Sequence, residues 1–139
     1  MKTIAFDTGI EEFQLQGGGV LRFNPGDPNL YARFLEAEAE LQALETEFSR
    51  QLEGLTDTQR AEAVVKLTAE TDQKVKALLN RVFGGDNDFD KALGGVNLLA
   101  VTADGQRVAE KLLGALEAIL TEGAARFAAD KAARIRSGQ

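Results

Sequence analysis

A heptad repeat of apolar residues is the feature that most constrains the fold of this 139-residue chain. Seven apolar side chains follow one another at alternating steps of four and three residues, with a longer last step: Leu30, Phe34, Ala37, Leu41, Leu44, Phe48 and Leu55. This spacing predicts a long α-helix with one apolar seam. Five glutamates are expected on its opposite side: Glu36, Glu38, Glu40, Glu45 and Glu47.

Residue types that begin and end helices place a second helix directly after the first. Asp27 is suited to cap the first helix and Pro28 to begin it, since proline loses no hydrogen bond there. Gly54 closes that helix, and residues 56–59 (Thr-Asp-Thr-Gln) match a capping box. The second helix is expected to reach about Phe83, with a weaker seam at Val64, Thr68, Thr71, Val75, Leu78 and Val82. A short connection between two long helices predicts an antiparallel hairpin.

An N-terminal β-hairpin is predicted over residues 10–24. Apolar and polar residues alternate there, and the apolar face consists of Phe13, Leu15, Leu21 and Phe23. The segment Gly17–Gly19 separates the two strands and can adopt the positive φ angles of a tight turn. Lys2–Phe6 is a candidate for a further short strand. Because a lone hairpin is marginally stable in water, its apolar face is expected to pack on helices or on another subunit.

The rest of the chain is predicted to be an irregular loop followed by one more helix. A short helical turn is expected at 88–93, and the last helix is expected to begin near Asp104 and to reach Arg136. We therefore predict a mainly α-helical fold, with an N-terminal β-hairpin followed by three long helices. One domain is expected over 1–139, made of a hairpin arm (1–26), a helical hairpin (27–83), the loop (84–104) and the C-terminal helix (105–136).

The charge distribution argues against nucleic acid as a partner. The chain has 16 basic and 22 acidic residues and a net charge of −6, whereas binding to phosphates needs clustered lysine and arginine. Four bases near the end, Arg126, Lys131, Arg134 and Arg136, are interpreted as a solvated helix end. No apolar run is long enough for a signal peptide or a membrane span, so we expect no membrane partner and a cytoplasmic location.

Missing residue types exclude most catalytic and cofactor sites. The chain has no histidine and no cysteine, so it cannot build a Ser-His-Asp triad, an iron–sulfur cluster, or the usual zinc and haem sites. Glutamate pairs such as Glu11 and Glu12 are expected to face solvent, without the burial that separates pKa values for acid–base catalysis. We therefore predict that the protein is not an enzyme and has no cofactor and no metal.

Two short motifs have simpler structural interpretations. Asp86, Asp88 and Asp90 have the spacing of the first ligands in an EF-hand loop. That match fails at Lys91, where the loop needs glycine, and at Asn97, where it needs glutamate. We expect the aspartates to cap a short helix instead. The glycine triplet of the hairpin lacks the residues of a phosphate-binding loop and is predicted to be a turn.

Several features, in order along the chain, resemble a known family. The hairpin is followed by residues 23–29 (Phe-Asn-Pro-Gly-Asp-Pro-Asn) and a long acidic helix. The second helix ends in residues 82–84 (Val-Phe-Gly), and the loop contains residues 93–98 (Leu-Gly-Gly-Val-Asn-Leu) before a C-terminal helix of mixed charge. In this order, and over most of its length, the chain resembles the tail assembly chaperones of long-tailed (siphovirus-type) phages and prophages.

The resemblance implies a role in viral tail assembly. In that family a small helical protein, made in the host cytoplasm, binds the long and aggregation-prone tape measure protein and recruits tail tube subunits. Its members have no catalytic site and are absent from the mature virion. The resemblance therefore implies two partners, the tape measure protein and the tail tube protein.

Self-association is also expected, because three helices and a hairpin make a thin body. We favour a core completed by a homo-oligomer over one closed within the chain. Partner-binding surfaces are expected in the loop and the last helix, at Phe83, Phe89, Leu93, Leu98, Leu99 and Phe127. Two other functions stay open: a structural tail or head component, such as a minor tail or connector protein, and a small cytoplasmic helical adaptor.

Overall fold

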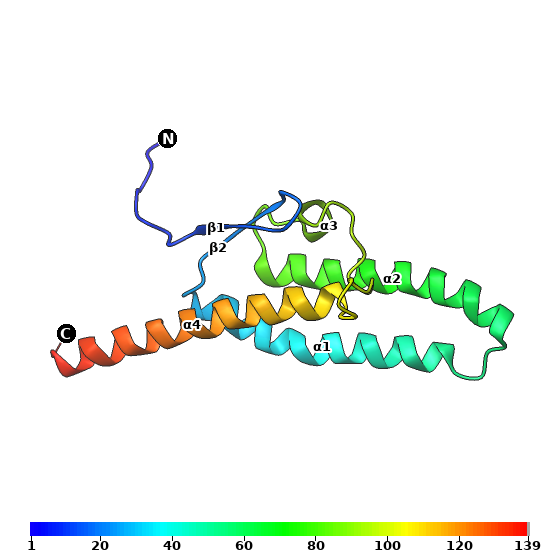
Figure 1. Ribbon diagram of the computed structural model, residues 1–139. Coiled ribbons are helices and arrows are strands. Elements are labelled where there is room, and N and C mark those ends of the chain that lie inside the picture. Colours follow the sequence, from blue (N-terminus) through cyan, green and yellow to red (C-terminus); the bar gives the residue numbers. More distant parts are fainter. Residues whose placement is uncertain (139) are drawn as a thin grey trace.

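The computed structural model, which describes residues 1–138, has the mainly helical architecture that the sequence predicts (Figure 1). Two strands come first, β1 (Glu11–Gln14) and β2 (Val20–Phe23). They are followed by α1 (Pro28–Leu52), α2 (Asp57–Phe83), the short α3 (Phe89–Ala92) and α4 (Val108–Arg136). The predicted N-terminal β-hairpin followed by three long helices is confirmed.

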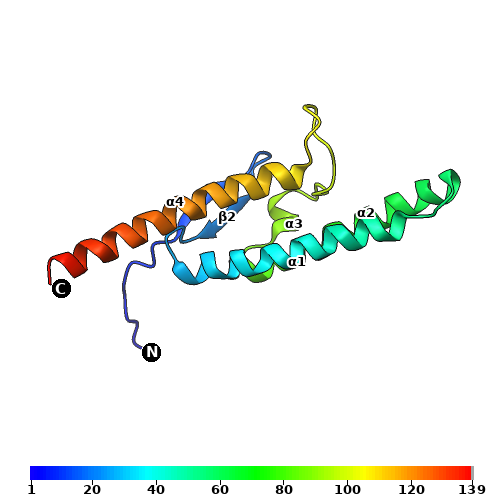
Figure 2. The same cartoon turned by 90° about the horizontal axis from the view of Figure 1, so that it is seen from below.

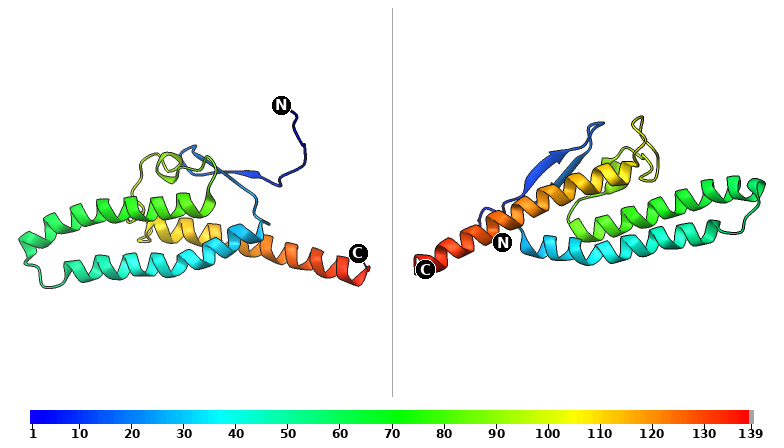
Figure 3. Two further views of the ribbon diagram at one scale, coloured as in Figure 1. Left: turned by 180° about the vertical axis from the view of Figure 1, so that it is seen from behind. Right: turned by 60° about the horizontal axis from the view of Figure 1, so that its bottom comes forward.

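The helix boundaries predicted in the first half of the chain are also confirmed. The Asp27 side chain accepts a hydrogen bond from the Asn29 backbone N–H at 2.9 Å and caps α1, whose first residue is Pro28. Thr56 and Gln59 form the capping box that begins α2. Because the connection between them is short, α1 and α2 lie side by side in opposite directions (Figures 1 and 3).

The β-hairpin packs its apolar face on the helices, as expected. β1 and β2 are antiparallel, with Phe13 opposite Leu21 and Glu12 opposite Arg22. Leu21 is fully buried, and Gly17 and Gly18 supply the positive φ angles of the turn. The expectation of a further strand at residues 2–6 is wrong, because residues 1–10 form no strand and pair with none.

The last helix begins later than the sequence indicates, at Val108 rather than near Asp104. Residues 102–106 form a turn instead, closed by a 2.7 Å hydrogen bond from the Thr102 N–H to the Gln106 carbonyl. The first free N–H groups of α4 bond to carbonyls of the preceding loop rather than to a capping side chain, for example Val108 N–H to Ala100 at 2.9 Å. A cap made by backbone carbonyls requires no particular side chain, so the sequence does not indicate where this helix begins.

An aromatic cluster joins the hairpin, α1, α2 and α3 into one core. Phe83 lies at its centre, with ring centroids 5.0 Å from Phe23, 5.3 Å from Phe89 and 6.4 Å from Phe34. Phe13 stacks on the outer side of Phe23 at 4.5 Å. Tilted and edge-to-face contacts of this kind add to the free energy gained by burying the rings.

The molecule is elongated because its helices extend past the core in opposite directions (Figures 1 and 2). The connected ends of α1 and α2 project one way, and the C-terminal half of α4 projects the other. The first half of α4 buries Leu112, Leu116 and Leu120, whereas Phe127 and Ile135 farther along are exposed. None of the helices described in residues 1–138 is long and apolar enough to cross a membrane.

Candidate functional site

The structure corrects half of the predicted partner-binding surface. Phe83, Phe89 and Leu98 are only 6%, 0% and 0% exposed, and all three belong to the core. No partner can contact these side chains in the folded protein. Leu93 is half-buried against the same core. Phe127, at 44% exposure, is the most accessible residue of the predicted set.

A row of polar residues on α2 explains why the loop packs so closely. The buried Lys76 lies with its Nζ 2.8 Å from Asp72 Oδ2, one turn earlier, and 2.7 Å from Asp90 Oδ1 in the loop. Asp72 Oδ1 also accepts a hydrogen bond from the Leu98 N–H at 2.7 Å. Asn80 Oδ1 accepts one from the Phe89 N–H at 2.8 Å. We call Asp72, Lys76 and Asn80 the polar row; it holds the loop on α2 at Phe89, Asp90 and Leu98.

Hydrogen bonds and opposite charges keep the side chains of Lys76 and Asp90 ionised. Burial alone would lower the pKa of Lys76, but its hydrogen bonds to Asp72 and Asp90 outweigh burial and raise that pKa above its ordinary value. The hydrogen bond from Lys76, with the charge of its ammonium group, lowers the pKa of the Asp90 carboxyl. Both groups therefore stay charged at neutral pH.

The acidic motif of the loop caps a helix, as expected. The Asp88 side chain accepts a 3.2 Å hydrogen bond from the Lys91 N–H and forms the N-cap of α3. Asp90 instead forms an ion pair with Lys76.

An open groove between α1 and α4 is the candidate functional site. It has a volume of about 400 Å³. The apolar side chains along it are Phe34, Leu41, Val75, Leu99, Ala109 and Leu113. Leu41, Leu99 and Leu113 are only half-buried. The groove forms because α4 meets α1 near the start of that helix and diverges from it farther along (Figure 2).

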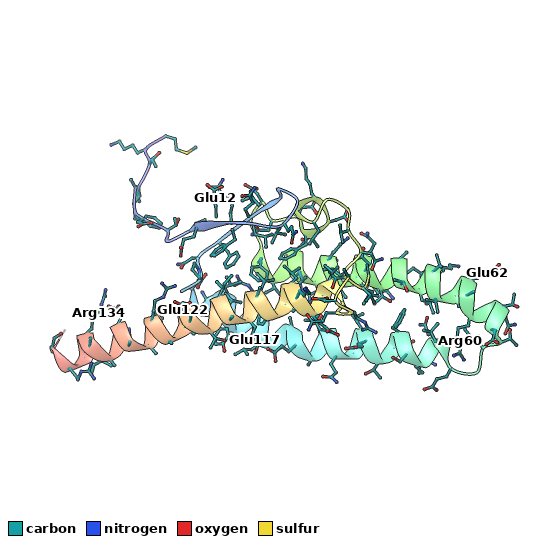
Figure 4. All side chains as sticks on the ribbon, in the orientation of Figure 1. Glu12, Arg60, Glu62, Glu117, Glu122 and Arg134 are labelled. Carbon is teal, nitrogen blue, oxygen red and sulfur yellow. The ribbon has the colours of Figure 1, made fainter. Side chains whose placement is uncertain are left out.

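The rim of the groove is acidic. Four glutamates line it, Glu38 and Glu45 from α1 and Glu110 and Glu117 from α4; Glu117 is labelled on α4 in Figure 4. Arg107 bonds to Glu45, with Nη1 3.1 Å from Oε1. The other three glutamates have no ion-pair partner among residues 1–138. An apolar floor with a negative rim fits an amphipathic segment that has basic residues at its edges.

Sequence reasoning missed most of this groove. Of the predicted surface residues, Leu99 alone lines it. Glu38 and Glu45 were expected opposite the apolar seam, but they lie on its flank, since both are rotated only slightly from Phe34 around the helix. A usable signal was the seven-residue spacing of acids beside a seam, which occurs in α1 and again at Glu110 and Glu117 in α4.

The comparisons with known proteins identify no family. Family models, curated proteins and solved structures all give no match to this chain. The groove is therefore interpreted from its own shape and charge.

Proposed function

We propose that this protein is a tail assembly chaperone of a long-tailed phage or prophage, which binds the tape measure protein and recruits tail tube subunits. The order of sequence features described above supports the family, and the groove between α1 and α4 supports the activity. The single observation that carries the proposal is a half-exposed apolar floor with an acidic rim on an elongated helical body.

The chemistry of the groove suits an aggregation-prone helical client. A helix with an apolar stripe can bury that stripe against Leu41, Leu99 and Leu113. The acidic surface of the bound chaperone then faces water, and its negative charge keeps neighbouring complexes apart. Because one groove covers only a short length of a long client, many copies are needed to coat it.

The location and partners follow from the proposed role. The protein acts in the host cytoplasm, as a non-enzymatic homo-oligomer, and leaves before the virion is complete. A structural component of the tail or head would remain in the particle instead. Mass spectrometry of purified virions separates these two functions, because only the structural component is recovered at a constant number of copies.

The direct test is a pull-down of the tagged chain, expressed together with the genes that flank it in its own genome. We expect recovery of a very long helical protein and a tube protein. Recovery of the tagged chain alone, as a closed oligomer, would contradict the proposal.

A matched pair of variants tests the groove itself. Leu113→Asp places a charge on the floor of the groove, whereas Leu35→Asp places the same charge on an exposed part of α1 that does not line it. We expect Leu113→Asp to reduce client recovery by roughly tenfold or more, the equivalent of about 1.4 kcal/mol, and Leu35→Asp to leave it unchanged. Circular dichroism must show that both variants are folded. Equal client recovery by both variants would mean that the client does not bind in the groove.

A further inference from the structure

The two outer edges of the β-hairpin differ in how their backbone groups are satisfied. On the β2 side, the Asn87 amide bonds to both backbone groups of Arg22, accepting from its N–H at 2.8 Å and donating to its carbonyl at 2.8 Å. One side chain thus takes the place of a neighbouring strand at Arg22.

The β1 edge is open. In an antiparallel pair, residues alternate between those that bond to the partner strand and those that point outward. The Leu15 N–H donates to the Gly19 carbonyl across the hairpin at 2.6 Å, so the odd-numbered residues of β1 bond toward β2. The backbone groups of Glu12 and Gln14, which alternate with them, therefore point outward. Neither has a backbone partner on that side among residues 1–138. In Figure 4, Glu12 lies on the side of the hairpin away from the helices.

The core is incomplete beside the same edge. Leu21 and Phe23 of β2 are buried, whereas Phe13 and Leu15 of β1 are only half-buried. Phe13 also forms the uncovered end of the aromatic cluster, since it stacks on Phe23 from the outside. A third strand beside β1 would cover these two side chains and extend the cluster.

The segment before β1, residues 1–10, has the pattern of such a strand. It pairs with no strand among residues 1–138, and it leaves Ile4, Phe6 and Ile10 exposed to 85%, 75% and 51% of their surface. These three residues lie an even number of positions apart, so in a strand their side chains would point to the same face. We call residues 1–10 the arm.

The arm cannot reach the β1 edge of its own chain in this conformation. Its base is held by a 3.2 Å hydrogen bond from the Asn24 side chain to the Thr8 carbonyl, and Asp7 accepts from the Gly9 N–H at 2.8 Å. From there the arm leads away from the sheet (Figures 1 and 3). A second copy, by contrast, offers both a free arm and an open edge.

We infer that the arm of one copy adds as a third strand to the open β1 edge of a second copy, whose own arm binds in return. Charge favours this partner, because Lys2 shares the face of Ile4 and Phe6 in the arm and is opposite in sign to Glu11, which shares the face of Phe13 in β1. The exchange is reciprocal, so it closes as a two-fold dimer. It uses a surface distinct from the groove and does not depend on the proposed function.

Cysteine cross-linking tests the exchange directly, because the chain has no native cysteine. Ala5 alternates with Ile4 and Phe6, so Ala5→Cys would lie on the solvent face of the added strand, and Glu12→Cys and Gln14→Cys lie on the solvent face of β1. Ala5→Cys is mixed with each β1 variant, with a mass tag on one partner, and oxidised. We expect a mixed disulfide dimer with at least one of the two. Ser49→Cys, which is exposed on α1, gives the background from random collision.

Two outcomes of this experiment would overturn the inference. One is mixed cross-linking no greater than with Ser49→Cys. The other is a double variant, Ala5→Cys with Glu12→Cys or Gln14→Cys, that closes only within one chain, which would mean that the arm folds back on its own edge.

Sedimentation of the full chain provides the second test. We expect a dimer, and we expect Phe6→Asp to weaken it by roughly tenfold or more without altering the fold, because Phe6 is exposed in the monomer. Glu12→Pro removes an outward N–H but no bond within the hairpin, so it should have the same effect while Glu12→Ala does not. A wild-type chain that stays monomeric, or a dimer that Phe6→Asp leaves intact, contradicts the inference.

Discussion

The two sides of the α1–α2 hairpin bury similar apolar side chains but are covered in opposite ways. On one side the glycine-rich loop is held by the polar row, and no buried side-chain nitrogen or oxygen in residues 1–138 lacks a hydrogen-bond partner. On the other side, α4 diverges from α1 and leaves an open groove. The irregular segment is therefore the closed surface, and the surface between two regular helices is the open one.

Regular secondary structure and solvent exposure are separate properties of a segment. A loop becomes part of the core when buried polar groups satisfy its backbone, as Asp72 and Asn80 do here. A helix with an apolar seam stays partly exposed when its neighbour crosses it at an angle and covers only part of its length.

A carboxylate placed on each side of the α1–α2 hairpin tests this contrast between a closed and an open surface most directly. Phe89→Asp puts a carboxylate into the core, where Phe89 is fully buried, and we expect it to abolish cooperative unfolding. The milder Phe89→Ala is expected to cost about 3–5 kcal/mol of unfolding free energy. Leu113→Asp, in the half-exposed groove, should cost far less. Urea unfolding followed by circular dichroism measures all three, and a stable Phe89→Asp variant would show that the loop is not core.

Much of the fold could be predicted because the decisive signals are local. The seam of α1, the Asp27 cap and the capping box at Thr56 act within a few residues of one another, and so does the glycine turn of the hairpin. The residues Phe89 and Leu98 were misplaced because their burial depends on Asp72, Lys76 and Asn80, which lie on another element. The groove depends on the crossing of α1 and α4, for which no local pattern exists.

The second prediction concerns the ion pairs of α2. Lys76→Ala leaves the buried Asp72 without its cation, and we expect a loss of about 3–5 kcal/mol in unfolding free energy. Arg81→Ala is the matched control on the same helix, because its pair with Glu40 is exposed on both sides and should contribute less than about 1 kcal/mol. Equal losses in thermal or chemical unfolding would mean that the polar row does not hold the loop.

The third prediction compares two glycines of α4. Gly123 lies where α4 crosses the chain before α1, and a Cβ there would overlap the Pro25 carbonyl. We expect Gly123→Ala to cost about 1–3 kcal/mol, because the two segments must move apart. Gly114→Ala meets open space in the same helix and should stabilise it by about 0.5–1 kcal/mol. Opposite shifts in melting temperature are the expected result, and a stabilising Gly123→Ala would place the crossing elsewhere.

The smallest expected effect is the pH dependence of the contact between Lys76 and Asp90. The pKa of Asp90 is lowered from its ordinary 3.8, so the contribution of this contact is complete above that value and is lost as the pH falls through the lowered pKa. The pKa of Lys76 is raised from 10.5, so the contribution is complete below 10.5 and is lost as the pH rises through the raised pKa.

An Asp90→Asn variant isolates this contribution, because asparagine resembles the protonated carboxyl in shape and charge. We expect the difference in urea midpoint between the wild type and Asp90→Asn to be constant between about pH 5 and 9 and to shrink below pH 4. The difference is expected to be modest, since the Asp90 side chain is about half-exposed. A difference that persists unchanged into acid would mean that Asp90 holds the loop through its shape and not through its charge.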